Sequence, residues 1–138
     1  MMRHILVVTT DSETRARAAR AVAELGYSVK FGRTPLKALG LVQRRRPAAV
    51  IVDVQLTSQG CSTFVEACRR EVSPAEMPIL VMAATPRAAI DAIRAGAQGC
   101  IKAPVDPATL LPMLSQVHLL APNYLPTVLQ RSSDKAVR

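Results

Sequence analysis

Short apolar segments alternate with segments of helical spacing along this 138-residue chain, and the alternation limits the fold more than any other feature. Runs rich in Val, Ile and Leu are typical of strands buried on both faces. The pattern predicts βα units, and therefore a doubly wound five-stranded parallel sheet with helices on both faces. Right-handed crossovers and the strand order 2-1-3-4-5 place the switch point between the first and third strands. The predicted strands cover residues 5–8, 28–31, 49–52, 78–82 and 99–102.

Glycine and proline indicate where several helices begin and end. Gly26 follows the helix predicted over residues 12–25 and suits a C-terminal stop. Thr34 and Thr85 each precede a proline, which is typical of an N-cap followed by proline in the first turn. A further helix is predicted over residues 62–70.

The last helix has two interpretations. It begins either at Asp106, which would place Pro112 in its interior and kink it, or near Thr109, which would place that proline in the first turn. We expect one domain over residues 1–120. Residues 121–138 read as a tail that is too short for an output domain.

Asp53 is the most informative polar residue, because it ends the clearest buried-strand segment of the chain. Burying an unpaired carboxylate is costly, so the strand should deliver Asp53 to a solvent-facing rim. Strand ends of open parallel sheets are where ligand chemistry gathers. The same topology brings Thr9, Thr10 and Asp11, which follow the first strand, close to Asp53.

The net charge of +8 is concentrated in residues 1–46, which carry ten Lys or Arg against three acids, or +7. A basic face can attract nucleic acid or an acidic partner. Solvated charges outside the apolar helix stripes are the simpler interpretation. The chain has only two Tyr and two Phe and no Trp, which argues against a stacking platform for single strands. Nucleic-acid binding is therefore not favoured.

The longest apolar runs, such as residues 79–84, are far too short to cross a bilayer. The first residues lead straight into a strand, without the apolar core of a signal peptide. We therefore expect a cytoplasmic protein with no membrane partner.

The cysteines and histidines show no catalytic or metal-binding spacing. Cys61, Cys68 and Cys100 form no CxxC or Cys–His pattern, so we expect ordinary core or surface residues. His4 and His118 are expected to be structural or exposed. No nucleophile–base pair is visible, so we do not expect an independent enzyme. No glycine-rich phosphate loop follows the first strand, which disfavours dinucleotide binding.

Five segments together resemble a known family. They are residues 5–8 (ILVV), 25–29 (LGYSV), 46–53 (RPAAVIVD), 78–82 (PILVM) and 94–104 (RAGAQGCIKAP). Over roughly residues 3–120 the chain resembles the bacterial response-regulator receiver, the CheY-like domain of two-component signalling. The resemblance implies a flavodoxin-like fold.

The resemblance also implies roles for individual positions. In that family an acidic pair after the first strand binds Mg²⁺, and an Asp after the third strand accepts a phosphoryl group. A hydroxyl ends the fourth strand, an aromatic lies in the fifth, and a Lys-Pro follows it. These positions fall on Thr9 and Thr10, Asp53, Ala83, Cys100 and Ala103, and Thr57 stands where the loop usually has proline. Among these key groups only Asp53 keeps the family's residue.

The replaced residues weaken a metal site. Mg²⁺ prefers carboxylate oxygens, whereas Thr9 and Thr10 offer neutral hydroxyls. Asp11 could supply one carboxylate beside Asp53, so Mg²⁺ binding at these two residues is at most weak and no other cofactor is expected.

The replaced residues also weaken a phosphorylation switch. Lys102 is one residue away from the expected lysine, and strand alternation points it to the other face unless a bulge intervenes. Thr85 could replace the hydroxyl lost at Ala83, although a capping role is simpler. A charge-assisted hydrogen bond contributes roughly 1.5–3 kcal/mol, and moving a switch from 1:99 to 99:1 needs about 5.5 kcal/mol. Because position 100 is Cys rather than an aromatic residue, no large side chain is present there to change conformation on phosphorylation.

Our leading hypothesis is an atypical receiver that acts as a protein-interaction module, with weak or no phosphorylation at Asp53. The resemblance implies partners such as a histidine kinase or an output protein, and a homodimer fits the family habit. It also implies a contact surface between the fourth strand and the fifth helix. That surface includes Arg87, Ile90, Asp91, Arg94, Lys102 and the region of Pro112.

Two other hypotheses stay open. One is a conventional single-domain response regulator that accepts a phosphoryl group on Asp53, with Asp11 helping to bind the metal. The other is a binder of nucleic acid or a small ligand, through the basic face or the crevice at the sheet edge.

Overall fold

A computed structural model of the chain describes residues 3–56, 58–102, 108–109 and 112–113. Its five strands form one parallel sheet in the predicted order, β2-β1-β3-β4-β5. Val7 at the centre pairs with Phe31 on one side and Ile51 on the other. The strands are β1 (His4–Val8), β2 (Ser28–Gly32), β3 (Ala49–Asp53), β4 (Ile79–Ala83) and β5 (Gly99–Lys102).

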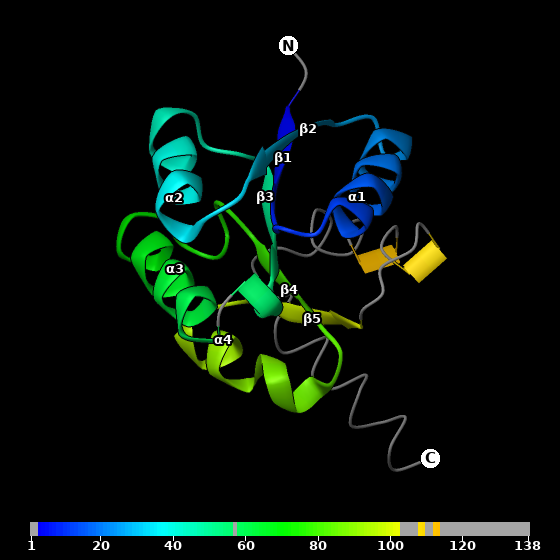
Figure 1. The fold of residues 1–138 in the computed structure, drawn as a ribbon. Helices are drawn as coiled ribbons and strands as arrows, with labels where there is room; N and C mark the ends of the chain where they lie inside the picture. Colours follow the sequence, from blue (N-terminus) through cyan, green and yellow to red (C-terminus); the bar gives the residue numbers. More distant parts are fainter. Residues whose placement is uncertain (1–2, 57, 103–107, 110–111, 114–138) are drawn as a thin grey trace.

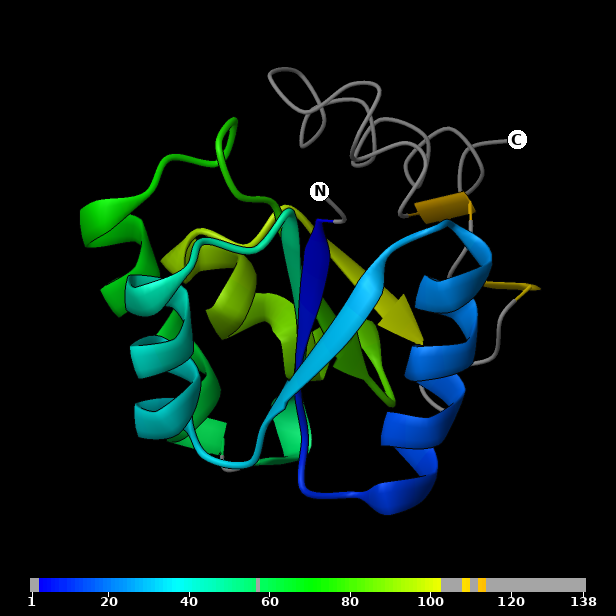
Figure 2. The ribbon, with the colours of Figure 1, turned by 90° about the horizontal axis from the view of Figure 1, so that it is seen from above.

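Helices cover both faces of the sheet, as Figures 1 and 2 show. Helix α1 lies on one face, while α2, α3 and α4 lie on the other. None of the described helices is long and apolar enough to span a membrane. The helices are α1 (Ser12–Glu24), α2 (Pro35–Arg44), α3 (Ser58–Glu71) and α4 (Ile90–Ala95), with single 3₁₀ turns η1 (Val54–Leu56) and η2 (Pro86–Ala89).

Two hydrophobic layers follow from the alternation of strand side chains. Leu6 and Val8 face α2, α3 and α4, where Phe64 is the largest buried side chain. Ile5 and Val7 face α1 in the second layer. Strands β1, β3 and β4 are buried along their whole length, as continuous apolar strands of a parallel sheet should be.

The predicted helix signals are confirmed. The Thr34 hydroxyl accepts a hydrogen bond from the Lys37 N–H at 3.2 Å, and the Thr85 hydroxyl accepts one from the Ala88 N–H at 3.3 Å. Gly26 has a φ of 84°, the left-handed conformation that favours glycine after a helix.

Two helices differ from their predicted extent. The helix predicted over residues 62–70 spans Ser58–Glu71, because its first residues, 58–60 (SQG), contain no apolar side chain that would indicate a first turn. The helix after Thr85 begins as a 3₁₀ turn before α4. The last predicted helix, with its start at Asp106 or Thr109, falls almost wholly outside the described residues, as do Thr57, Ala103, His118 and the tail over 121–138.

Arg69 joins four segments at the amino ends of β4 and β5. Its guanidinium donates to the carbonyl oxygens of Gly96 at 2.9 Å, Met77 at 2.8 Å and Val72 at 3.3 Å. It also donates to Gln98 Oε1 at 2.7 Å, and the same oxygen accepts from a backbone N–H of β4. Burial lowers the pKa of Arg69 to about 10, so the side chain stays charged at neutral pH. This network ties α3 and α4 to the start of the sheet.

Candidate functional site

Asp53 ends β3 at the carboxyl end of the sheet, where it pairs with Met82 of β4. Its Oδ2 accepts a hydrogen bond from Thr9 Oγ1 at 2.9 Å, and its Oδ1 accepts one from the Gln55 N–H at 3.0 Å. Asp53 is only 9% exposed, whereas the sequence predicted a carboxylate on a solvent-facing rim. The carboxylate is nearly buried, and two hydrogen-bond donors compensate for its desolvation.

Thr9 is the side chain that holds Asp53 in place. It directly follows β1, and its backbone N–H donates to the Gly32 carbonyl oxygen at 3.1 Å. Its buried hydroxyl donates to Asp53 and accepts from the Asp11 N–H at 3.1 Å. Sequence reasoning treated Thr9 only as a lost metal ligand and missed this bond. The signal was available, because parallel pairing of β1 with β3 places the residues after Val8 beside Asp53.

Asp11 serves the first helix. It is the N-cap of α1, and its Oδ2 accepts from the Thr14 N–H at 2.9 Å and from the Thr14 hydroxyl. The Thr14 hydroxyl, and then its backbone N–H, hold the pKa of Asp11 below its ordinary value. Thr10 beside it is exposed. Of the two residues expected to bind a metal, Asp11 is bonded to α1 and Asp53 is bonded to Thr9.

These groups do not fit a resident Mg²⁺ ion. Mg²⁺ needs near-octahedral oxygen ligands and usually one or two carboxylates. The Thr9 proton points to Asp53, and the Asp11 carboxylate caps a helix. In the part of the chain that the structure describes, no three side chains of His, Cys, Asp or Glu gather as a metal site.

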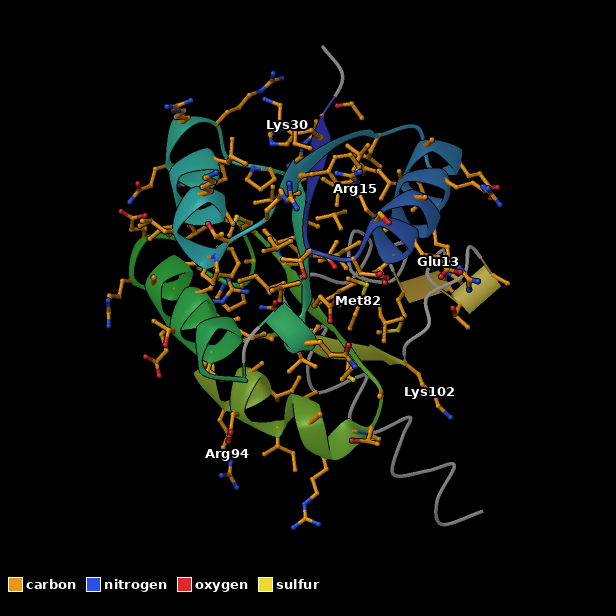
Figure 3. All side chains as sticks on the ribbon, viewed as in Figure 1. Glu13, Arg15, Lys30, Met82, Arg94 and Lys102 are labelled. Atoms are coloured by element: carbon orange, nitrogen blue, oxygen red, sulfur yellow. The ribbon has the colours of Figure 1, made fainter. Side chains whose placement is uncertain are left out.

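Ala83 and Cys100 leave space where the resemblance implies a hydroxyl and an aromatic ring. Ala83 ends β4 and is buried, while Cys100 lies half-buried in β5. Together with Ile90 and Ile93 they line an apolar pocket of about 510 Å³. Lys102 lines the same pocket, and Figure 3 shows it projecting outward from the end of β5. The described hydrogen bonds of Asp53 come from Thr9 and Gln55, and none of them comes from Lys102. We call this hollow the β5–α4 pocket.

Some of the predicted contact residues line the β5–α4 pocket, and all of them are open to solvent. Ile90 is 43% exposed, and with Leu36 it is one of two exposed large apolar side chains among the described residues. Arg94 lines the pocket, and Thr85 lines it while its hydroxyl caps the following turn. The remaining predicted contact residues are also exposed: Arg87, Asp91, Lys102 and Pro112.

Two of the three cysteines are ordinary core residues, as predicted. Cys61 and Cys68 are fully buried, and burial raises the pKa of each thiol to about 11. The charge of Asp53 adds to the effect at Cys61. Burial also raises the pKa of Cys100. All three thiols therefore stay protonated at neutral pH.

The sheet order, the two helical layers and the carboxylate at the end of β3 define a class: flavodoxin-like, CheY-like domains with a candidate acceptor at the sheet edge. The family model of the response regulator receiver domain matches residues 5–115. The chain belongs to this family of two-component signalling domains.

Similar proteins agree with this assignment. The chain is 28% identical over 104 residues to the photosynthetic apparatus regulatory protein RegA of Rhodobacter capsulatus, a match covering 75% of this chain and 56% of RegA. It is 36% identical over 81 residues to the response regulator MprA of Mycobacterium sp. strain KMS, covering 58% of this chain and 34% of MprA. The chain thus spans about half or less of these relatives.

Solved structures also resemble this fold. The chemotaxis response regulator CheY4 of Vibrio cholerae superposes with a TM-score of 0.75 at 27% identity, covering 85% of this chain and 99% of CheY4. A response regulator from Chloroflexus aurantiacus superposes with a TM-score of 0.76 at 22% identity, covering 85% of this chain and 98% of that structure, and supports the fold alone.

Proposed function

We propose that this receiver domain acts as a constitutive protein-interaction module in two-component signalling, with weak or no phosphorylation at Asp53 and no catalytic activity of its own. The bond from the Thr9 hydroxyl to Asp53 carries the proposal. It joins the acceptor carboxylate to a neutral side chain at the position where the family has a metal-binding acid.

The Asp53 site lacks the groups that favour phosphoryl transfer. Such catalysis depends almost entirely on positioning and on electrostatic stabilisation of the transferred group. Asp11 is bonded to α1, Ala83 offers no hydroxyl, and Lys102 lines another pocket. Each missing charge-assisted contact removes roughly 1.5–3 kcal/mol. A phosphoryl group on Asp53 would therefore form slowly and do little to change the fold.

The β5–α4 pocket supports the interaction role. An apolar hollow beside an exposed Ile90, with Arg94 and Lys102 in its lining, suits an apolar side chain of a partner that also carries acidic residues. Candidate partners are a histidine kinase or an output protein. The small side chains of Ala83 and Cys100 keep the pocket open without phosphorylation.

Intact-mass measurement after incubation with acetyl phosphate and Mg²⁺ tests the Asp53 site. We expect less than a tenth of the chain to gain a phosphoryl group. The double variant Thr9→Asp/Thr10→Asp restores two carboxylates and should raise that fraction severalfold. An Asp53→Ala control should show no gain in either background.

A wild-type mass gain approaching the whole population and absent from Asp53→Ala would contradict the proposal and favour the conventional phosphoaccepting domain. Partner capture tests the second half of the proposal. Cys100→Phe fills the β5–α4 pocket and should weaken capture of the partner at least tenfold. The matched substitution Ala16→Phe, at an exposed position of α1, should leave capture unchanged.

A further inference from the structure

A second concave surface lies at the opposite edge of the sheet. Strand β2 is the outermost strand there, and α2 packs beside it. A groove of about 460 Å³ lies between them, lined by residues from Phe31 to Arg44. This volume is within the range of small-ligand sites, roughly 300–1,000 Å³. The groove is separated from the β5–α4 pocket by the width of the sheet, so it is independent of the proposed partner surface.

The charged side chains that line the groove are all cationic. They are Arg33, Lys37 and Arg44, all exposed, and no acidic residue lines the groove with them. The two ion pairs found among the described residues involve other arginines, so none of the three has a carboxylate partner within that part of the chain. Three like charges along one groove repel one another, and a bound anion would relieve that repulsion.

Gly40 keeps the middle of the groove open. It lies in the interior of α2, where glycine costs roughly 0.5–1 kcal/mol relative to alanine. A Cβ at Gly40 would meet no atom within 4 Å, so packing does not require glycine. Lys37, Gly40, Leu41 and Arg44 share one face of the helix by their spacing. The missing side chain leaves space between two cations and above the half-buried Leu41.

The free edge of β2 adds a backbone donor. The Ser28 N–H and the Gly32 carbonyl oxygen bond toward the β1 side. Because successive residues of a strand direct their backbone groups to opposite sides, the N–H groups of Val29 and Phe31 face the free edge. Phe31 lines the groove. Backbone N–H groups beside guanidinium groups are typical contacts of a phosphate.

We propose that the β2–α2 groove binds an organic phosphate, such as a nucleoside phosphate. The anionic group contacts Arg33, Lys37 and Arg44, because guanidinium groups match the oxygens of a phosphate in pairs. The uncharged part of the ligand occupies the space above Gly40 and contacts Leu41. A concave groove with cations around a small apolar floor favours a compact ligand over an extended polymer.

Titration calorimetry with the full chain tests this site, with ATP, pyrophosphate and a twelve-nucleotide oligothymidylate as probes. We expect ATP to bind at least fivefold more tightly than pyrophosphate, because only ATP carries a nucleoside that can occupy the space above Gly40. Lys37→Gln/Arg44→Gln should weaken ATP binding at least tenfold. Arg20→Gln/Arg70→Gln removes the same charge from exposed positions of α1 and α3, and should change it less than twofold.

Gly40→Leu is the sharpest variant, because it fills the groove and also removes an unfavourable helix glycine. We expect a melting temperature at or above that of the wild type and at least tenfold weaker ATP binding. Wild-type ATP affinity in Gly40→Leu would overturn the assignment to this groove, and so would an absence of ATP binding in the wild type. Equal affinity for ATP and pyrophosphate would overturn the organic ligand in favour of a simple anion site. Tighter binding of the oligonucleotide would overturn it in favour of a nucleic-acid surface.

Discussion

The two ends of the sheet are built differently. At the amino ends of β4 and β5, Arg69 alone donates four hydrogen bonds to partly buried oxygens. At the carboxyl end of β3, Asp53 receives two bonds, from Thr9 and a backbone N–H. The dense network holds α3 and α4 against the sheet, whereas the sparse one leaves a nearly buried carboxylate with only two hydrogen-bond donors. The comparison predicts that the amino end contributes more to stability, while the proposed binding surface uses the carboxyl end.

The largest expected effect comes from breaking the Arg69 network. Arg69→Met keeps the apolar stem but removes every donor, leaving the carbonyl oxygens of Met77 and Gly96 and the Gln98 amide oxygen short of partners. Unsatisfied buried polar groups cost roughly 1–3 kcal/mol each, so the free energy of unfolding should fall by about 3 kcal/mol in urea titration. Arg70→Met next to it is exposed and should change stability by less than about 0.5 kcal/mol. Equal losses of unfolding free energy in Arg69→Met and Arg70→Met would show that Arg69 contributes no more than an exposed arginine, and would contradict the contrast between the two ends of the sheet.

The next prediction compares two glycine substitutions. One strains only the backbone, and the other also displaces the Arg69 side chain. Gly96 has a φ of 127°, and a Cβ there would lie 2.6 Å from Arg69 Cγ. Gly26 has a φ of 84°, and a Cβ there would meet nothing within 4 Å. Gly26→Ala should cost about 1 kcal/mol through strain alone, and Gly96→Ala about 2–3 kcal/mol because Arg69 must also shift. Thermal unfolding measures both. A smaller loss for Gly96→Ala than for Gly26→Ala would show that Arg69 moves freely.

A smaller loss is expected at the carboxyl end. Thr9→Val removes the hydroxyl that donates to the Asp53 carboxylate, so stability at neutral pH should fall by roughly 1.5–2 kcal/mol. Thr9→Ser keeps the donor and should recover most of the loss, and Thr10→Val at the exposed neighbouring position should be nearly neutral. Urea titration of the three variants checks this. A loss as large as that of Arg69→Met would contradict the assignment of stability to the amino end.

The smallest expected effect is the pH dependence that arises from His4. Burial, and then the charges of Lys30 and Arg45, hold the pKa of His4 below 6.5. The unfolded chain therefore binds the proton more readily than the folded chain, and stability should fall as the pH drops from about 6.5 through the lower folded value. The loss from Asp11 occurs separately, below its ordinary pKa of 3.8, because its folded pKa is lowered. His4→Gln should flatten the stability curve below about pH 6.5, as followed by thermal melts. If the stability of His4→Gln still falls with pH as it does in the wild type, His4 is not the source of the pH dependence.

The sequence was sufficient for the sheet order, the Thr34 and Thr85 caps and the place of Asp53. Each of these depends on a local signal: apolar periodicity, a Thr-Pro pair, or a polar residue at the end of a strand. Strand order then followed from the alternation and from right-handed crossovers. The same reasoning placed Thr9 beside Asp53 without foreseeing the hydrogen bond, because that depends on the direction of one hydroxyl.

The Arg69 network and the two pockets could not be predicted. Arginine on a helix reads as a solvated charge, and its partners Met77, Gly96 and Gln98 are separated from it by up to 29 residues. The β5–α4 pocket depends on what small residues leave unfilled, which only the packed structure shows. The groove beside Gly40 is similar, since an interior glycine of a helix in sequence indicates only weak helix propensity.

The most direct test of the central claim is an amide NMR spectrum recorded with and without beryllofluoride, a mimic of the phosphoryl group, in the presence of Mg²⁺. If the domain is a constitutive interaction module, the signals of Ile90, Cys100 and Lys102 around the β5–α4 pocket should stay unchanged, as in Asp53→Ala. Shifts of these signals in the wild type that disappear in Asp53→Ala would show a working phosphorylation switch and would contradict the account.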